Sequence, residues 1–385
     1  MGGVSMEWKE VTLGEIAIFK TGKLNSNAAI SNGEYPFFTC SPETLRINSY
    51  AFDQEAILLA GNNAEGNFSI KYYKGKFNAY QRTYVITPKR GKVDIKFLYY
   101  ALSLCLKQLK NMSQGTSTKF LTVTILNSFS VQLPSFSDQR RIASILSSLD
   151  RKIELNNKIN ADLEEMAQAI FKNWFVDFEP FKDGKFVNSE LGMIPEGWKV
   201  GILKDLLYLR KDSIKSTNRG KLPYLPIDTI PMHNLVATDF KSNEEAKSSL
   251  QIFEENDIIV GAMRVYFHRV ILAPCRGITR TTCFVLSVKD ENNLAYSLMQ
   301  CNQDEAISFA ERTSKGSTMP YAVWDGGYGE YKIVIPPCDV MKSFNDLLCN
   351  FLSKMNENAI ENRNLSLLRD TLLPRLMSGE LEVPE

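Results

Sequence analysis

The stretch IASILSSLDRKIELNNKINADLEEMAQAI, which runs from Ile142 to Ile170, decides the fold of this 385-residue chain. Alternating steps of three and four residues through it reach nine positions, which are Ile142, Ile145, Leu149, Lys152, Asn156, Ile159, Leu163, Met166 and Ile170. Seven of these nine residues are apolar, and Lys152 and Asn156 are the two polar ones. This spacing is typical of the buried seam of a coiled coil. Between Gln139 and Phe175 such a helix would rise about 55 Å, at roughly 1.5 Å per residue.

A second stretch repeats this pattern 202 residues further along the chain. Its nine positions are Phe344, Leu347, Phe351, Lys354, Asn358, Glu361, Leu365, Leu368 and Leu372. Six of these nine residues are apolar. Pro374 is expected to end or kink this helix. Neither helix can bury its apolar stripe alone, so we expect the two to pair with each other. An antiparallel pair, which would carry the two globular domains to opposite ends, is the arrangement we expect. Pairing with other chains is the alternative.

The polar interruptions of the stripe also recur, because Lys152 and Asn156 return as Lys354 and Asn358. In an antiparallel pair with a pseudo-two-fold axis, Asn156 and Asn358 would lie near the axis and could hydrogen-bond to each other. A buried asparagine of this kind fixes the register of a coiled coil. The sequence therefore predicts Asn156 and Asn358 as the register pair.

The rest of the chain repeats as well, with an offset near 200 residues. Each half holds short β-branched and aromatic runs, then one short helix, near Ile95–Lys110 or near Asn293–Arg312, and then its long helix. Five pairs of segments keep the same order: Trp8-Lys9 and Trp198-Lys199, Ile57–Gly61 and Asp257–Gly261, Thr83–Thr87 and Cys283–Ser287, Ser113–Phe120 and Ser314–Tyr321, Val131–Pro134 and Ile333–Pro336.

These features predict an α+β chain in which two similar α/β domains are joined by two long antiparallel coiled-coil helices. The arrangement would be pseudo-two-fold, like a dimer made from one chain. The expected boundaries are residues 1–137 for the first domain, 138–178 for the first helix, 179–337 for the second domain with a linker at 179–195, and 338–385 for the second helix and tail.

Composition narrows the classes of protein to consider. No apolar run reaches the roughly 18–20 residues that a membrane span needs, and the N-terminus lacks a secretory-signal pattern. We therefore expect a cytoplasmic chain with no membrane partner. The seven cysteines form no CxxC pair, which indicates reduced thiols rather than zinc ligands. Since His233 and His268 are the only histidines, we expect no metal site.

The net charge of +1 is low for a protein that binds nucleic acid unaided. Residues 1–137 are the exception, with 15 lysines and arginines against 9 acidic residues. Only this part has the excess of positive charge that attracts phosphate. If the chain binds DNA, we expect a partner to supply much of the affinity.

Three longer strings resemble the specificity subunit of type I restriction-modification systems. They are LDRKIELNNKINADLEEMAQAIFKNWFVDFEPF at Leu149–Phe181, SELGMIPEGWK at Ser189–Lys199 and LLRDTLLPRLMSGEL at Leu367–Leu381. The alternation of a variable domain and a long helix is also that family's layout. The resemblance covers essentially the whole chain.

The resemblance implies a subunit without catalysis or a bound cofactor of its own. Two target-recognition domains with curled β-sheets would each bind one part of a split site in double-stranded DNA. The central helices would bind two modification (methyltransferase) subunits, which methylate adenine with S-adenosylmethionine. Restriction (translocase-nuclease) subunits would join them and cut DNA with ATP and Mg²⁺.

Base reading needs exposed donors and acceptors, and several polar clusters in both halves meet that need. The GTSTK segment and its partner GST recur at equivalent positions, although each could also be an ordinary turn, and the other clusters could be solvated loops. The candidate DNA-binding residues are Asn62, Asn63, Asn67, Tyr80, Gln81, Arg82, Thr116, Ser117, Thr118, Lys119, Arg264, Tyr266, His268, Arg269, Arg280, Thr281, Ser317 and Thr318.

An aromatic run at the end of the first long helix is a candidate contact for a methyltransferase subunit. It comprises Trp174, Phe175 and Phe178, with Phe181 just beyond. The simpler interpretation is that these rings pack on the chain's own second domain.

Enzymatic interpretations have weak support. Asp94-Ile95-Lys96 and Glu330-Tyr331-Lys332 have the acid-x-Lys spacing of metal-dependent nucleases, but no paired acid accompanies either. The glycine-rich Asp325–Glu330 precedes a strand rather than a helix, and no GxxxxGK[ST] phosphate loop or Asn-Pro-Pro-aromatic motif occurs. The remaining alternative to a DNA reader is a coiled-coil scaffold with two protein-binding domains.

Overall fold

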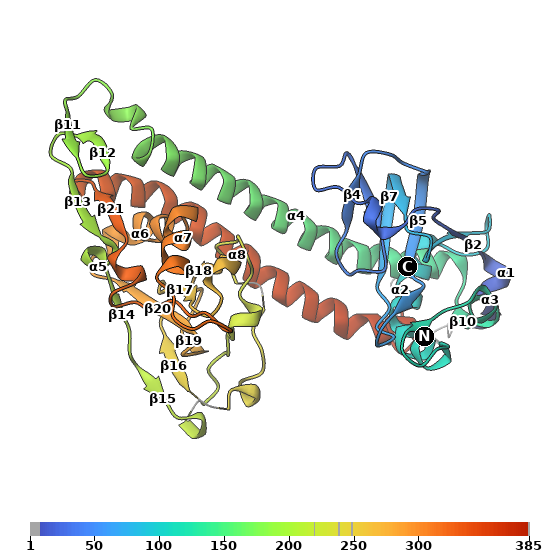
Figure 1. Cartoon of the computed structure of the whole chain (residues 1–385). Coiled ribbons are helices and arrows are strands. Elements are labelled where there is room, and N and C mark those ends of the chain that lie inside the picture. Colours follow the sequence, from blue (N-terminus) through green and yellow to red (C-terminus); the bar gives the residue numbers. More distant parts are fainter. Residues whose placement is uncertain (1–7, 219, 238, 248, 384–385) are drawn as a thin grey trace. The chain divides into compact units, whose positions relative to one another are not determined.

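The computed structural model describes residues 8–218, 220–237, 239–247 and 249–383. The chain divides into two compact units (Figure 1). Unit 1 comprises Met1–Arg151 with Ser366–Glu385, and unit 2 comprises Lys152–Leu365. Each unit therefore contains part of both long helices, which the sequence had suggested as segments separate from the domains. Within the described residues, no helix is both long and apolar enough to cross a membrane.

Unit 1 is built on a six-stranded sheet with helix α2 (Ile95–Met112) packed against β5 and β7. Asp94 caps α2, because its Oδ1 accepts hydrogen bonds from the backbone N–H groups of Lys96 and Phe97, each at 3.0 Å. All neighbouring strands are antiparallel except β3 and β7. The strand order is β2 (Ala17–Thr21), β8 (Thr83–Pro88), β5 (Phe52–Ala60), β7 (Ile70–Ala79), β3 (Tyr35–Phe38) and β4 (Leu45–Ile47).

Unit 2 is built on a four-stranded antiparallel sheet and a smaller three-stranded one. The single short helix expected near Asn293–Arg312 is two helices, α6 (Leu294–Cys301) and α7 (Asp304–Arg312). The larger sheet has the order β14 (Leu207–Leu209), β20 (Cys283–Val288), β17 (Ile258–Gly261) and β18 (Val270–Leu272), and the smaller one β15 (Ser213–Ile214), β16 (Leu250–Phe253) and β19 (Gly277–Arg280).

The two units share one topology. The order β2-β8-β5-β7 in unit 1 corresponds to β14-β20-β17-β18 in unit 2. Each unit also closes with a two-stranded antiparallel pair that leads into a long helix. These pairs are β1 (Lys9–Thr12) with β10 (Ser130–Leu133), and β13 (Lys199–Ile202) with β21 (Lys332–Ile335). The internal repeat predicted from the sequence is therefore confirmed as a structural repeat.

Strand pairing corrects the alignment of the repeat by one residue. Ile57 in β5 faces Ile86, and Ile258 in β17 faces Leu286. Gly61 therefore corresponds to Ala262 rather than to Gly261. The two backbone carbonyls confirm this, because Gly61 O accepts from Leu121 N and Ala262 O accepts from Ala322 N, each at 2.8 Å.

The long helices are α4 (Phe136–Phe175) and α8 (Cys338–Met377). Ser135 caps the start of α4, since its Oγ accepts from Asp138 N at 3.2 Å. Pro374 lies inside α8 and does not end it, because the helix continues to Met377. The turn after α8 is made by Gly379, whose φ of 74° is the left-handed conformation that commonly terminates helices.

The helices lie side by side and antiparallel within each unit (Figure 1). In unit 2 the rings of Phe171 and Phe344 lie 6.1 Å apart, and further along α4 Asn156 bonds to Asn362. In unit 1 Asp150 Oδ1 accepts from Arg369 Nη1 at 2.9 Å. Residues later in α4 therefore contact residues earlier in α8, from Arg369 back to Phe344. The two helices are antiparallel, as predicted.

The buried stripe differs from the predicted one at several positions along both helices. Five predicted seam positions are exposed: Lys152, Met166, Leu347, Lys354 and Leu368. An α-helix has 3.6 residues per turn, so a stripe stepped at 3.5 drifts by about 20° per heptad. The core of unit 2 also covers the helices and buries Ala167, Phe171 and Leu348 in place of the predicted positions.

The register pair is also corrected, because Asn156 and Asn358 do not bond to each other. Asn156 Nδ2 donates to Asn362 Oδ1 at 2.9 Å, and Asn358 Nδ2 donates to Asn160 Oδ1 at 2.8 Å. Asn160 and Asn362 are themselves related by the 202-residue repeat of the helices. The two bonds are therefore equivalent by the local pseudo-two-fold of the helix pair, whose centre lies between them.

Candidate nucleic-acid interface

The GTSTK segment of unit 1 forms a tight closed loop. The backbones of Gln114 and Phe120 exchange two hydrogen bonds, of 3.0 and 2.9 Å, across its base. Gly115 has φ 97°, and a Cβ there would lie 2.1 Å from the carbonyl oxygen of Thr118, so the turn needs glycine. The side chains of Thr116, Ser117 and Thr118 are exposed.

Strand pairing brings this loop to the polar segment that follows β5. The short strands β6 (Asn62–Asn63) and β9 (Lys119–Phe120) are antiparallel, with Asn62 opposite Phe120 and Asn63 opposite Lys119. Gln81 and Arg82, which follow β7, are exposed beside them. Asn62, Gln81 and Arg82 line one cavity of about 440 Å³ together with Thr21, Gly61, Tyr84, Phe120 and Leu121.

The unit 1 cavity contains an unsatisfied acceptor. The side-chain oxygen of Asn62 is buried and has no hydrogen-bond partner among the described residues. Buried polar atoms are nearly always paired, so this oxygen is an exception in a residue that lines the cavity. The exposed Gln81 donates from Nε2 to Asn25 Oδ1 at 2.8 Å, which fixes the orientation of its amide.

Other predicted residues nearby build the loop instead of facing the cavity. Asn63 Oδ1 accepts from the backbone N–H groups of Glu65 and Asn67, at 2.9 and 3.0 Å, and so closes the turn. Asn67 is exposed and accepts from Lys110 Nζ at 2.9 Å. Tyr80 is half-buried. Sequence reasoning missed Lys110, because it lies on the last turn of α2 and no local pattern marks it.

Unit 2 has the same loop and cavity in the equivalent place. Lys315 and Tyr321 exchange two backbone hydrogen bonds of 2.9 Å, and Met263 bridges to Tyr321 as Asn62 pairs with Phe120. Gly316 has φ 89°, and Ser317 and Thr318 are exposed. The adjoining cavity of about 450 Å³ is lined by Leu209, Ala262, Met263, Thr281, Thr282, Phe284, Lys315, Tyr321, Ala322, Val323, Trp324 and Asp325.

The two cavities differ in chemistry at matching positions. Asn62 corresponds to Met263, and Leu121 to Ala322. Near the position of Arg82, unit 2 presents the hydroxyls of Thr281 and Thr282. The structural repeat thus holds two similar cavities with different donors and acceptors.

Two predicted DNA-binding residues of unit 2 are buried or half-buried and contact their own unit. His268 is 5% exposed, and its Nε2 lies 3.0 Å from both the backbone and the side-chain oxygen of Asn302. Arg269 is half-buried and donates from Nη1 to the carbonyl of Ile227. The short 3₁₀ turn η6 (Val265–Phe267) is flanked by left-handed residues and turns the chain inward at His268.

The other candidates of unit 2 remain exposed. These are Arg264 and Tyr266 beside η6, Arg280 at the end of β19, and Thr281 at the cavity. Arg264 has φ 51°, and its backbone N–H donates to Pro320 O at 2.8 Å, which anchors this segment to the loop that contains Ser317 and Thr318.

The aromatic run at the end of α4 packs within unit 2. Phe175 is 6% exposed, and its ring lies 4.7 Å from Tyr296 and 4.8 Å from Phe344. Trp174 and Phe178 are half-buried, and Phe178 stacks edge-on against Trp198. Phe175 is therefore not available to a partner, because the core of its own unit covers it.

The acidic motifs weighed as nuclease sites have structural roles. Asp94 caps α2. Glu330 and Asp325 both contact Lys204 Nζ, at 2.6 and 2.8 Å, and hydrogen bonding to this lysine lowers the pKa of each carboxyl group. Asp325–Glu330 forms the turn that leads into β21 through η8 (Tyr328–Glu330).

Comparisons with known proteins agree with this architecture. The family described as the type I restriction modification DNA specificity domain matches residues 6–165. The solved S subunit of a type I restriction-modification system from M. genitalium has the same fold, with a TM-score of 0.63 and 16% identity over 100% of this chain and 98% of that one.

Two relatives are similar over most of their length. The MjaIX specificity subunit of Methanocaldococcus jannaschii is 30% identical over 316 residues, which cover 78% of this chain and 72% of that protein. The EcoDI specificity subunit of Escherichia coli is 30% identical over 417 residues, which cover 99% of this chain and 90% of that protein. With this similarity in sequence and the shared fold, the chain belongs to the specificity subunits of type I restriction enzymes, whose role is the recognition of DNA sequence.

Proposed function

We propose that this specificity subunit reads a split, asymmetric site in double-stranded DNA, with one half-site for each unit. The observation that supports this most strongly is the pair of equivalent loop-and-cavity sites lined by different side chains. Equivalent backbones would present both sites to DNA in the same way. Different side chains would then select different bases.

In unit 1 the chemistry suits direct reading of base edges. Asn and Gln amides match the donor and acceptor pair of adenine, and arginine matches the two acceptors of guanine. Asn62, Gln81 and Arg82 supply these groups at one cavity. Lys110 and Lys119, which both lie beside Gly66, are suited to phosphate contacts that position the unit without selecting sequence.

In unit 2 the cavity offers hydroxyls and apolar surface, and arginines lie outside it. Thr281 can accept or donate a hydrogen bond, and Met263 suits contact with a thymine methyl group. Arg264 and Arg280 are exposed. This unit should therefore prefer a different half-site from unit 1.

Methylome sequencing tests the proposal directly. A host that carries the subunit with its methyltransferase would be compared with hosts that carry Gln81→Ala and Arg82→Ala, or Thr281→Ala and Arg280→Ala. The unit 1 changes should relax bases in one half-site only, and the unit 2 changes should relax bases in the other. Arg90→Ala, at an exposed arginine outside both cavities, is the control.

Two outcomes would count against the proposal. Both sets of variants could alter the same half-site, which would contradict one reader per unit. Alternatively, the methylated motif could stay unchanged in every variant. That result is expected if the chain is a coiled-coil scaffold with two protein-binding domains.

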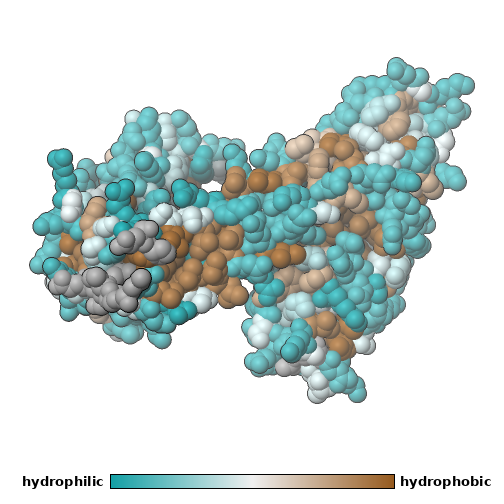
Figure 2. Space-filling view, turned by 180° about the vertical axis from the view of Figure 1, so that it is seen from behind, coloured by the Kyte–Doolittle hydropathy of each residue, from teal (hydrophilic) through white to brown (hydrophobic). Residues whose placement is uncertain are grey.

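We further propose that two methyltransferase subunits dock on the long helices. Met166 in α4 and Leu368 in α8 are equivalent by the 202-residue repeat, and their side chains are 49% and 46% exposed. Apolar side chains are visible at the surface along the helices (Figure 2). Contiguous exposed apolar surface marks sites of protein contact, and the same two helices also expose Leu155, Ile360 and Leu367. A duplicated position within such a surface suggests two partners.

The cofactors of the complex would then belong to other subunits. The methyltransferase subunits would hold S-adenosylmethionine for adenine methylation. Restriction subunits would use ATP and Mg²⁺ to translocate and cut DNA. The chain described here would supply the choice of sequence.

A further inference from the structure

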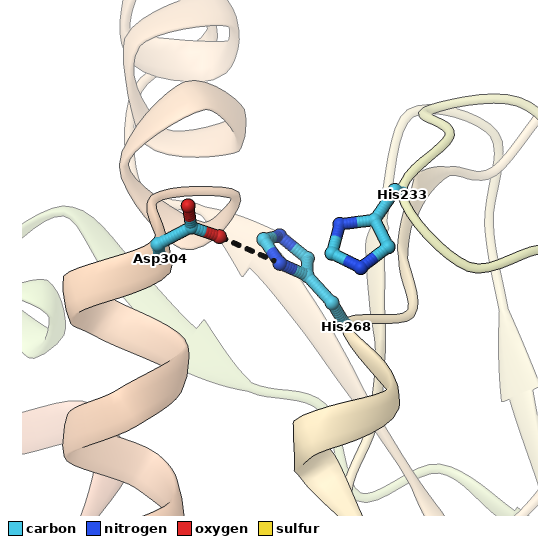
Figure 3. Close-up of side chains that lie close together, drawn as sticks. All are labelled: His233, His268 and Asp304. Atoms are coloured by element: carbon cyan, nitrogen blue, oxygen red, sulfur yellow. Dashed lines mark ion pairs between the residues drawn. The ribbon is translucent and has the colours of Figure 1, made fainter. Parts of the chain in front are cut away.

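A cluster of His233, His268 and Asp304 lies in unit 2, apart from the loop-and-cavity site (Figure 3). The three residues come from a loop before Leu235, from the end of η6 and from the first turn of α7. One ligand atom from each lies within 4.8 Å of the others. The fold thus brings both histidines of the chain together with a carboxylate.

The spacing inside the cluster fits a tetrahedral metal ion. His268 Nδ1 lies 3.1 Å from Asp304 Oδ1. Ligands that bind zinc at about 2.0–2.1 Å in a tetrahedron lie roughly 3.3 Å from each other, so these two atoms need almost no adjustment. The rings of His233 and His268 lie 4.5 Å apart at their centroids and are tilted by 49°. A small rotation of the exposed His233 would bring its ring nitrogen to the same ion.

The surroundings of His268 match those of a metal ligand. The ring is buried, and Nε2 lies 3.0 Å from the backbone carbonyl oxygen of Asn302. If Nε2 carries the proton and donates to that oxygen, Nδ1 has a free lone pair directed at Asp304. A second-shell carbonyl of this kind fixes the tautomer and orientation of ligating histidines.

The cluster also has an open side. His233, His268 and Asp304 all line a cavity of about 820 Å³, together with Gln300, Gln303 and Glu305 among other residues. Three protein ligands with a fourth position open to water are typical of a zinc site that is not purely structural. The backbone N–H of His233 donates to His268 O at 2.9 Å, which holds the two histidine segments together.

We propose that unit 2 binds one divalent transition-metal ion of the zinc class through His233, His268 and Asp304. Two imidazole ligands favour zinc, cobalt or nickel over magnesium or calcium, which prefer oxygen ligands only. The ion ties the His233 loop and η6 to the start of α7. This site revises the expectation from sequence that two histidines are too few for metal, and it is independent of the proposed reading of DNA.

The test uses the full chain without a histidine tag, because an affinity tag would bind the same metals. Zinc affinity is measured by competition with a chelating dye, and Co²⁺ is used as a spectroscopic probe. We expect one equivalent of metal per chain and visible Co²⁺ bands of tetrahedral intensity. The seven cysteines could also bind Co²⁺, but the near-ultraviolet charge-transfer band of a cobalt–thiolate bond should be absent.

His233→Ala and Asp304→Asn both change exposed side chains, so the fold should survive. Each should weaken zinc binding by at least about 10-fold, because loss of an outer-shell partner alone typically costs that much and loss of a ligand should cost no less. Glu305→Gln, which changes an acid of the same cavity outside the cluster, is the matched control and should keep full affinity. Binding that is unaffected by His233→Ala and Asp304→Asn, or no stoichiometric binding of Zn²⁺ or Co²⁺, would overturn the proposal.

Discussion

Gly115 shows how one residue shapes the site proposed to meet DNA. Its φ of 97° is strained for any side chain, and an added Cβ would meet the Thr118 carbonyl oxygen at 2.1 Å. Gly115→Ala should therefore displace the GTSTK loop and weaken binding of the cognate duplex by about 10-fold, or about 1.4 kcal/mol. Fluorescence anisotropy on the complex with methyltransferase measures this loss.

Gly91→Ala is a matched control for that change. Gly91 has φ 72°, also left-handed, but a Cβ there would meet nothing within 4 Å. Both variants should lose about 1 kcal/mol of unfolding free energy from the backbone conformation. Only Gly115→Ala should lose affinity, and equal affinities for the two variants would show that the loop does not matter for binding.

Glu164 is a buried acid in α4, and its burial raises the pKa of its carboxyl group. The folded state therefore holds the proton more tightly than the unfolded state, whose pKa lies near 4.5. This contribution to stability is complete below pH 4.5 and is lost as pH rises through the folded pKa. Glu164→Gln, which keeps an oxygen to accept from Leu235 N, should raise the melting temperature at pH 8 and not below about pH 4.

Thermal melts at the two pH values check this prediction. Glu165→Gln changes the exposed neighbour on the same helix and should shift the melting temperature equally at both. A melting temperature of Glu164→Gln that is lower than that of the parent at pH 8 would mean that the charged carboxylate stabilises the fold.

Individual site residues could be predicted only in part. Asn62, Gln81 and Arg82 meet at one cavity, as polar residues next to strand ends often do. His268 and Arg269 appeared equivalent in sequence but turn inward after η6. The left-handed backbone conformations of Arg264 and His268 cannot be recognised from their residue types, because neither is glycine. The direction of that turn therefore could not be predicted from the sequence.

At the scale of elements, the asparagine bonds define the helix register. Asn358→Leu leaves Asn160 Oδ1 buried without its donor and should cost about 1–3 kcal/mol of unfolding free energy. Asn160→Leu should also destabilise. In the double variant the two leucines can pack together, so the coupling energy in a double-mutant cycle should be about 0.5–3 kcal/mol.

Denaturant unfolding of the four proteins measures the coupling. Asn350→Leu provides the comparison, because Asn350 is exposed two turns earlier on α8 and should combine additively with Asn358→Leu. A coupling no larger than that of the comparison pair would mean that the Asn160–Asn358 contact does not hold the register.

Periodicity predicted both helices and, through the matched pattern, their pairing with each other, but not the whole buried stripe. Asn156 and Asn358 are buried as expected, whereas Met166 and Leu368 are exposed. Periodicity on one helix cannot reveal which further surface will cover it. In unit 2 that surface is the sheet and helix core, which buries Phe171 and Leu348.

At the scale of the whole molecule, the duplication predicts the stoichiometry of docking. Met166→Glu and Leu368→Glu each place a charge at one of two equivalent exposed positions. Each should release one of two methyltransferase subunits, and the double variant should release both, because an unpaired charge at the centre of an apolar contact is strongly unfavourable. Native mass spectrometry of the co-expressed complex counts the subunits.

Met193→Glu is the control for added charge. Met193 is 55% exposed in β12 (Gly192–Pro195) of the hairpin with β11 (Phe186–Ser189), which is not part of either long helix. It should leave two methyltransferase subunits bound. A double variant of Met166 and Leu368 that also retains two would place docking elsewhere on the chain.

The sequence by itself determined the duplicated plan and the two long helices, because hydrophobic periodicity and internal repetition can be recognised along the chain without its tertiary structure. Only the tertiary structure decided which polar residues share a cavity, which asparagines meet, and that His233, His268 and Asp304 come together. The contacts of the histidine cluster and of the paired asparagines join residues that lie 35 to 206 positions apart. Their geometry depends on turns, strand register and packing from several elements at once, and no single stretch of sequence contains that information.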